Sequence, residues 1–161
     1  MVLGLQGAPA AAWDLQRGSF FLVGQALVEF GPFGLDVYKA RLLTGGPQER
    51  LIELEYLRDV PRYLSLKGWE KGFSHLQRDK NGSDAIDWIL SNTPDFKKGD
   101  RFTMLTVGTM THLFLNGQLL ATTQDPRVSE IIHDPWIGEQ ALDADIKALL
   151  LGNVRDQKSI H

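Results

Sequence analysis

The pair Asn116-Gly117 lies between two short runs rich in apolar and β-branched residues, and it constrains the fold more than any other feature. An Asn-Gly pair fits the two central positions of a tight hairpin turn, whose twist matches that of two antiparallel strands. The flanking residues 111–115 and 118–123 are therefore predicted to form a hairpin. Residues 101–107 precede it and are predicted to be a further strand.

Three more strands are predicted nearer the N-terminus. Residues 19–29 and 33–43 are rich in Phe, Leu and Val, and Gly31-Pro32 separates them because proline cannot donate to a strand ladder. The turn sequence TGGPQ leads into residues 50–58, where apolar and polar positions alternate. These three segments are joined by short turns, which favours antiparallel pairing.

Helices are predicted between the two groups of strands and after them. Trp69, Phe73 and Leu76 recur at helical spacing, and a second helix is predicted to begin at a cap formed by Ser83 or Asp84. Later, Asp125-Pro126 opens a third helix, because proline suits the first helical turn. Residues 142–151 are predicted as the last helix, with Gly152 as its C-terminal stop.

This order predicts an α+β fold. Runs of strands interrupted by helix pairs are typical of a mainly antiparallel sheet with helices packed on one face, an open-faced sandwich. No repeat or linker-like stretch interrupts residues 19–153, so we expect one domain there. Residues 1–18 and 154–161 are expected to be flexible ends.

The first residues carry a possible export signal. The segment MVLGLQGAPAAAW contains three consecutive alanines, the small-residue pattern that signal peptidase accepts, although it lacks a basic region before it. We expect the remnant of a signal peptide and hence a periplasmic or secreted protein. A flexible alanine-rich terminus on a cytoplasmic protein is the alternative.

Charge and composition exclude several classes of function. The net charge is −3 and no basic run is interleaved with aromatic residues, so a nucleic-acid partner is not expected. No stretch reaches the roughly 18–20 apolar residues that span a bilayer, so no integral membrane segment is expected. The chain has no cysteine, which excludes disulfides, thiolate catalysis and cysteine-ligated zinc.

No catalytic or cofactor motif is recognisable. The four histidines show no close metal-ligand spacing, and hydrolase, phosphate-loop and dinucleotide glycine patterns are absent from the sequence. No metal, cofactor or catalytic residue is therefore predicted. Trp69, Phe73, Trp88 and Trp136 are interpreted as core residues rather than as the lining of a ligand site. Nothing in the sequence sets an oligomeric state.

Arg58 is the residue that most suggests a binding site. By strand alternation it shares a face with Ile52, Leu54 and Tyr56, which is the more apolar and inward face. A guanidinium that points inward cannot lose its proton and requires a partner. A structural ion pair or strand-end anchor, with the neighbouring Asp59 as a helix cap, is the alternative.

Five segments in this order resemble the bacterial chalcone isomerase-like proteins. They are DVYKARLL at 36–43, LEYLRDV at 54–60, FKKGDRFTM at 96–104, FLNGQLL at 114–120 and IKALLLG at 146–152. The resemblance covers most of residues 20–152 and depends on the joint order of these segments. It implies the same open-faced sandwich, with an apolar cleft between sheet and helices.

The resemblance does not extend to the residues that isomerise chalcones. The plant enzymes place an arginine on the first strand and a threonine before the tract that resembles GLDVY. Here residues 20–30 contain no arginine, and Gly34 occupies the threonine position. Without that cation and that hydroxyl, the electrostatic stabilisation of the developing charge is lost, so isomerase activity is not expected.

Ligand binding is what the resemblance leaves open. Non-catalytic relatives of this fold are associated with fatty acids, whose carboxylate meets an arginine and a tyrosine. Arg58 is the nearest counterpart of that arginine, and Tyr56 and Tyr63 are the candidates for the tyrosine. The predicted partner is thus a small apolar or acyl molecule. The alternatives are an isomerase- or lyase-type enzyme that reuses Arg58 and Tyr63, and a scaffold of the cell envelope.

Overall fold

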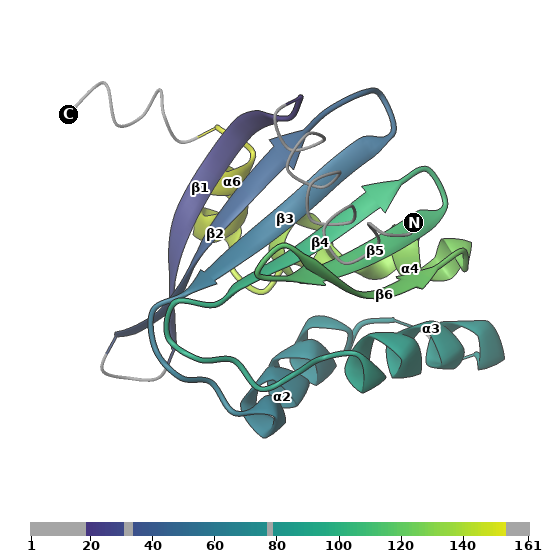
Figure 1. Ribbon diagram of the computed structural model, residues 1–161, viewed down its shortest axis with the longest axis horizontal. Helices are drawn as coiled ribbons and strands as arrows, with labels where there is room; N and C mark the ends of the chain where they lie inside the picture. The colour runs from purple at the N-terminus through teal and green to yellow at the C-terminus, as the bar shows by residue number, and fades with distance from the viewer. Residues whose placement is uncertain (1–18, 31–33, 77–78, 154–161) are drawn as a thin grey trace, which may run out of the picture.

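The computed structural model describes residues 19–30, 34–76 and 79–153. Both predicted flexible ends, the signal-peptide remnant among them, lie outside these ranges, as does the Gly31-Pro32 break. The described chain forms one six-stranded antiparallel sheet in which the strands follow their order in the sequence (Figure 1). The strands are β1 (Phe21–Phe30), β2 (Leu35–Thr44), β3 (Glu49–Tyr56), β4 (Arg101–Val107), β5 (Met110–Leu115) and β6 (Gln118–Thr123).

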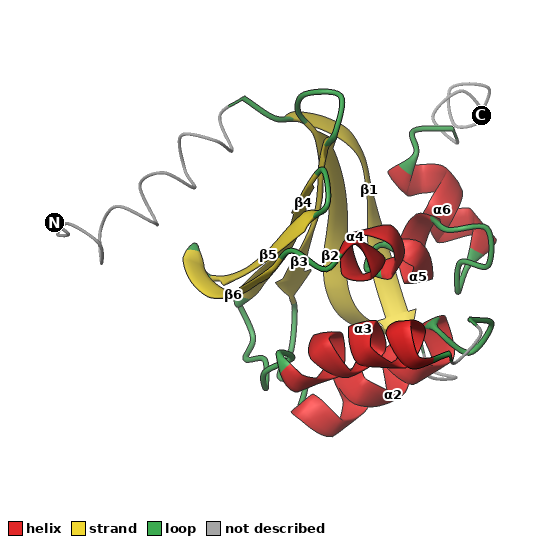
Figure 2. Ribbon diagram, turned by 90° about the vertical axis from the view of Figure 1, so that its right-hand side faces the viewer, coloured by secondary structure: helices red, strands yellow, loops and turns green. Residues whose placement is uncertain are grey.

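All described helices lie on one side of this sheet (Figure 2). They are α2 (Arg62–Gly72), α3 (Lys80–Ser91), α4 (Pro126–Ile131), α5 (Asp134–Ile137) and α6 (Ala144–Leu150). The predicted α+β open-faced sandwich is confirmed. None of the described helices is both long and apolar enough to cross a membrane.

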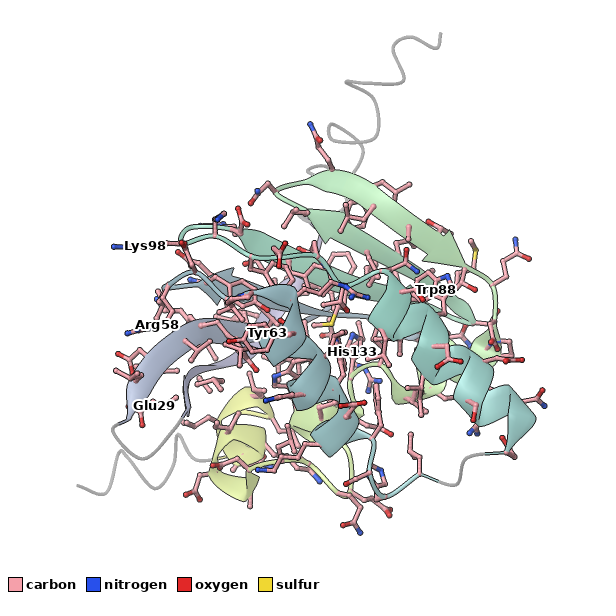
Figure 3. All side chains as sticks on the ribbon, turned by 90° about the horizontal axis from the view of Figure 1, so that it is seen from below. Glu29, Arg58, Tyr63, Trp88, Lys98 and His133 are labelled. Atoms are coloured by element: carbon pink, nitrogen blue, oxygen red, sulfur yellow. The ribbon has the colours of Figure 1, made fainter. Side chains whose placement is uncertain are left out.

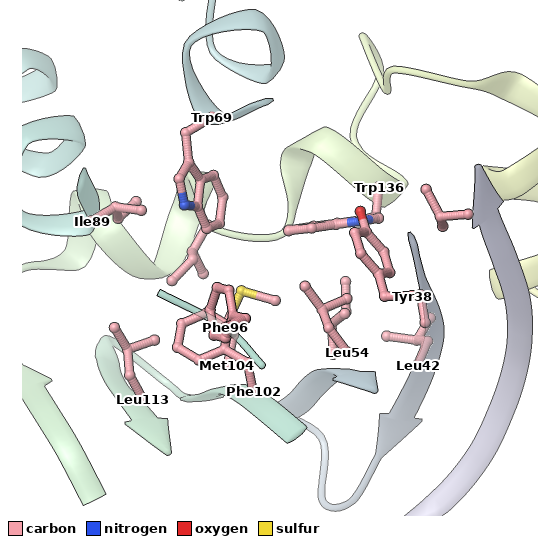
Figure 4. Close-up of a cluster of buried hydrophobic side chains, with 14 of the residues drawn as sticks. Tyr38, Leu42, Leu54, Trp69, Ile89, Phe96, Phe102, Met104, Leu113 and Trp136 are labelled. Carbon is pink, nitrogen blue, oxygen red and sulfur yellow. The ribbon is translucent and has the colours of Figure 1, made fainter. Parts of the chain in front are cut away.

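The main core fills the layer between sheet and helices (Figure 4). Strand alternation directs Ile52, Leu54 and Tyr56 of β3 into this layer, as the sequence predicted. Residues from the helices meet them, with Trp69 and Phe73 at the end of α2 and Trp136 from α5 all buried. The predicted burial of Trp69, Phe73 and Trp136 in the core is confirmed, although Trp69 and Trp136 also line a cavity. Trp88 packs against that core as a half-buried residue.

The opposite face of the sheet has its own apolar cluster and a charged group. Phe20, Leu43, Leu51, Leu105 and Phe114 are buried there together. On the same face Arg41 bridges two carboxylates, at 3.2 Å from Glu53 and 3.1 Å from Glu55. The alternation of β3 therefore separates an apolar face toward the helices from a mixed face on the other side.

Turn chemistry fixes most element boundaries as predicted. Asn116 and Gly117 both adopt positive φ, at 53° and 83°, as a two-residue hairpin turn requires. Asp125 caps α4 ahead of Pro126, and Gly152 takes a positive φ just beyond α6. The hairpin turn, the start of α4 and the end of α6 are thus confirmed.

Two predicted caps are wrong. Helix α3 starts at Lys80, where Asp79 accepts a hydrogen bond from the amide of Gly82, so the helix begins before Ser83 and Asp84. Asp59 does not cap α2, because its carboxylate accepts from the amide of Lys98 at 2.8 Å. Pro61 holds the N-cap position of α2 without any side-chain hydrogen bond of its own, and the carboxylate of Asp95 instead accepts from the amide of Arg62 at 2.6 Å.

Candidate ligand cavity beneath helix α2

A small apolar cavity lies between α2 and the ends of β2, β3 and β4. We call it the α2 cavity. Its walls come from three strands, from α2 and α5, and from the loops that follow β3, α3 and α5. They are Val37, Tyr38, Leu54, Tyr56, Val60, Leu64, Ser65, Gly68, Trp69, Phe96, Phe102, Pro135, Trp136 and Leu142. None of these described lining residues carries a charge.

Six of the fourteen lining residues are aromatic. Figure 4 shows Tyr38, Trp69, Phe96, Phe102 and Trp136 among them. Tyr56 stacks on Phe96 with ring centres 4.1 Å apart, and Phe102 packs at a tilt behind Phe96. On the helix side the indoles of Trp69 and Trp136 meet edge to face at 5.4 Å. Offset and edge-to-face pairs of this kind hold rings in fixed positions. The wall is therefore pre-organised on the sheet side.

The polar atoms of the cavity are hydroxyls and one indole N–H. Trp136 Nε1 donates to the hydroxyl of Tyr38 at 2.9 Å, and both residues are buried. The side chain of Ser65 on α2 lies near the hydroxyl of Tyr56 across the sheet–helix boundary. These groups are neutral donors and acceptors, so the cavity can form hydrogen bonds with a ligand but offers it no charged partner.

Burial keeps both tyrosines protonated. Desolvation raises the pKa of Tyr38 to about 12, although the hydrogen bond from Trp136 lowers it in part. Desolvation also raises the pKa of Tyr56 well above its usual value, with a further contribution from the neighbouring Tyr38. A phenol with a raised pKa stays protonated at neutral pH, so it keeps its hydrogen for donation and is a poor base. The site is suited to binding rather than to proton abstraction.

The cavity is small. Its volume is about 50 Å³, which is room for a few water molecules, whereas ligand sites for small molecules usually measure about 300–1,000 Å³. A larger guest must displace part of the wall. The sheet side consists of paired strands and stacked rings, so α2 is the part that must give way.

Helix α2 is weakly held along most of its length. Of its residues only Trp69 and Gly72 are fully buried. Gly68 faces the cavity, and a Cβ placed there would meet no atom within 4 Å. A glycine inside a helix costs roughly 1 kcal/mol relative to alanine. The helix covers the cavity without filling it.

The two ends of α2 are anchored to other elements. Arg62 donates from Nε to the carbonyl of Thr93 and from a terminal nitrogen to that of Leu90, both at 2.9 Å. Trp69 Nε1 donates to Thr93 Oγ1 at 3.0 Å, and Gly72 lies close against Pro135 of α5. Between these anchors, Leu64, Ser65 and Gly68 form the movable part of the cover.

The structure brings one of the three predicted ligand residues to the cavity. Tyr56 lines it and is buried, with 5% of its surface exposed. Tyr63 is 59% exposed on the outer side of α2, where its ring lies under the ammonium of Lys67 (Figure 3). The structure does not bring Tyr56, Tyr63 and Arg58 together in one site.

The predicted inward orientation of Arg58 is wrong. Strand β3 ends at Tyr56, two residues earlier than expected, so alternation no longer determines the direction of this side chain. Arg58 is exposed at the rim of the molecule, and its Nε donates to the carbonyl of Asp36 at 2.8 Å (Figure 3). The anchoring role considered as an alternative matches this contact.

The position aligned with the catalytic threonine is geometrically unsuited to it. Gly34 is exposed and has a φ of +62°, in the left-handed region that β-branched residues avoid. A threonine at this position would be strained. Within the described ranges, no group of three acidic or histidine side chains is arranged to hold a metal ion.

Sequence reasoning missed Tyr38, Ser65 and the cavity role of Trp136. Tyr38 lies at an inward position of β2, within the tract DVYKARLL, and no sequence signal marked it as part of a site. Its pairing with Trp136 joins residues 98 positions apart, and no local pattern encodes such a contact. Ser65 gave no signal, because a serine early in a helix usually faces water.

Comparison with known proteins agrees with this architecture. The model of the chalcone isomerase-like family matches residues 37–152. This chain belongs to the chalcone isomerase-like family. No curated protein matches the sequence.

A solved structure shares the fold. The chain is similar to a fatty-acid binding protein of Arabidopsis thaliana, with a TM-score of 0.66 and 13% sequence identity. The match covers 84% of this chain and 88% of the plant protein. At that identity the similarity establishes the fold alone.

Proposed function

We propose that this chalcone isomerase-like protein binds a small apolar molecule in the α2 cavity and performs no chemistry on it. The proposal depends on one observation: an uncharged cavity of aliphatic and aromatic side chains, with hydroxyl groups in its wall and a helix with few buried residues as its cover. The fatty-acid binding protein with the same fold supports an acyl chain as the ligand. Burial of such a chain contributes about 0.8 kcal/mol per methylene.

Ligand binding requires α2 to move outward between its anchors. The segment around Leu64, Ser65 and Gly68 separates from the sheet, and the acyl chain then lies between Trp69, Phe96 and Phe102. The contact between Tyr56 and Ser65 is lost in this motion, and the Tyr56 hydroxyl can then donate to the head group of the ligand. The ligand thus replaces an internal contact with an equivalent one.

An ionised head group belongs at the rim. A bare carboxylate inside an uncharged cavity loses more hydration energy than hydroxyl groups return. Arg58 lies between Tyr56 and Val60 in the chain, and both of those residues line the cavity. We therefore retain the predicted contact between Arg58 and an acidic head, now as a contact at the exposed mouth.

The proposal is tested with dodecanoic acid and dodecanol as probes and tryptophan fluorescence as the readout, because Trp69 and Trp136 line the cavity. Both probes are expected to bind the wild type. Gly68→Leu fills the cavity from the helix side and is expected to abolish binding, while Gly68→Ala, the matched control, retains it. Equal binding to wild type and Gly68→Leu would contradict the proposal.

The head-group assignment has its own test. Arg58→Gln is expected to weaken dodecanoic acid about tenfold, as loss of a charge-assisted contact predicts, and to leave dodecanol unchanged. Tyr56→Phe is expected to weaken both probes. If Arg58→Gln changes neither affinity, the arginine has no part in binding, although the cavity itself is still tested by the Gly68 variants.

A further inference from the structure

A second recess lies at the opposite end of β3. It is an open groove of about 740 Å³ between the β2–β3 turn (residues 44–49), the β4–β5 turn around Gly108 and the exposed side of α4. Its lining is mostly polar or glycine, and it includes Thr106 and Ser129. We call it the turn groove. Arg50, the second residue of β3, also lines it.

Arg50 is held in place by a buried histidine. Its Nε donates to His133 Nδ1 at 3.0 Å, and His133 Nε2 lies 2.8 Å from the carbonyl of Met104. Because Nδ1 accepts, the ring proton must be on Nε2 and must be donated to that carbonyl. His133 is fully buried between sheet and helices (Figure 3). A neutral imidazole thus orients the guanidinium and leaves its charge uncompensated.

The remaining donors of Arg50 are open. Neither terminal nitrogen has a hydrogen bond or an ion pair with any residue in the described ranges, and neither is among the buried atoms that lack a partner. Both therefore reach solvent. Since the side chain is half-buried and lines the turn groove, they are accessible from that groove.

Two carboxylates lie near Arg50, and neither forms an ion pair with it. Asp134 interacts with it only at longer range, and desolvation raises the pKa of this carboxyl. Glu49 also lines the groove, but its Oε1 accepts from the amide of Gly46 at 2.7 Å. Desolvation lowers the pKa of Arg50, and the nearby Asp134 offsets this effect only in part.

We propose that the turn groove binds an oxyanion, a carboxylate or phosphate group of a small polar ligand, on the terminal nitrogens of Arg50. A planar guanidinium presents two parallel N–H groups to such an anion, and a fixed Nε removes the entropy cost of orienting it. Thr106 and Ser129 line the same groove, but their hydroxyls donate to the carbonyls of Arg50 and Pro126, so the guanidinium of Arg50 is the group that would hold the anion. This site is separate from the α2 cavity and does not depend on the function proposed there.

The test uses inorganic phosphate and succinate as probes, with ionic strength held constant by sodium chloride. In ¹H–¹⁵N spectra of the full chain, saturable shifts are expected for the amides of Gly45, Gly46 and Gly108 and for the Nε–H of Arg50. Saturation by phosphate identifies a tetrahedral anion as the preferred group, and saturation by succinate identifies a carboxylate. If neither probe produced saturable shifts, the proposal would be overturned.

Variants separate a specific site from general charge attraction. Arg50→Gln is expected to weaken binding about tenfold or more, as loss of two charge-assisted hydrogen bonds predicts. Ser129→Asp adds a negative charge at the groove wall without touching the Arg50–His133 contact, and it is expected to weaken binding. This variant tests the site independently if Arg50→Gln does not fold. Arg101→Gln, an exposed cation outside the groove, is the control. An equal loss in Arg101→Gln, or full binding by Ser129→Asp, would refute the site.

Discussion

At the Tyr56 end of β3, the layer between sheet and helices contains uncharged hydroxyl and indole groups, whereas at the Arg50 end the same strand places a guanidinium against an imidazole. Both residues lie on the helix side of the sheet, and the apolar Ile52 and Leu54 lie between them on that face. The first end is closed by a helix with few buried residues. The second opens onto a groove between turns.

This difference shows how one layer can have two kinds of recess. An uncharged end loses little hydration free energy when water is replaced by an apolar ligand, so a movable cover is enough to make it a binding site. A charged end cannot be closed in the same way, because a guanidinium keeps its proton and requires water or an anion. Four measurements test or sharpen this contrast.

The largest effect is expected at the charged end. His133→Leu leaves the Nε of Arg50 and the carbonyl of Met104 without their partner, and each unpaired buried group costs about 1–3 kcal/mol. We expect a loss of about 3 kcal/mol in the free energy of unfolding, measured with urea. A loss below about 1 kcal/mol would show that His133 does not hold this end together.

The same histidine makes stability depend on pH. Burial and the nearby Arg50 lower the pKa of His133 to about 3, against 6.5 for the unfolded chain. The unfolded state therefore binds more protons between these values, so stability is complete above pH 6.5 and falls as the pH decreases. Between pH 7 and pH 5 we expect a loss of about 2 kcal/mol. His133→Gln is expected to lack this component of the pH profile.

The uncharged end should be less sensitive to the loss of one polar atom. Tyr38→Phe removes the acceptor for Trp136 Nε1, and we expect a cost of about 1.5 kcal/mol with little change between pH 5 and pH 9. Urea unfolding at both pH values measures it. A steep pH dependence that disappears in Tyr38→Phe would mean that this tyrosine titrates, which contradicts its raised pKa.

The smallest effect has the opposite sign. Gly68→Ala places a methyl group where no atom lies within 4 Å, and it adds helix propensity to α2. We expect a gain of about 0.5–1 kcal/mol in stability. Thermal unfolding of the two proteins provides the comparison. A destabilised variant would indicate that the cavity is already occupied by side chains.

Local patterns in the sequence predicted the fold well. The Asn116-Gly117 turn, the alternation in β3 and the Asp125-Pro126 helix start each depend on neighbouring residues, and each was confirmed. The cap of α3 was misplaced because Asn81-Gly82 also suits a turn. In the structure Asp79 caps the helix, and Asn81 and Gly82 lie in its first turn. Boundaries decided by two competing local signals were the weak point.

The candidate site was less accessible to sequence reasoning. Alternation was extended to Arg58 although the strand ends at Tyr56, so a surface residue was assigned to the interior. The pairs that define the two ends, Tyr38 with Trp136 and Arg50 with His133, each join distant segments. Those contacts are set by how α5 packs on the sheet, which no local pattern contains.

The central claim is that an apolar ligand lies between α2 and the sheet. The most direct measurement is the set of nuclear Overhauser contacts between ¹³C-labelled dodecanoic acid and the protein. The account predicts contacts from the acyl chain to the indole of Trp69 and the rings of Phe96 and Phe102, with none in Gly68→Leu. Contacts confined to surface residues such as Tyr63, or contacts unchanged in Gly68→Leu, would contradict it.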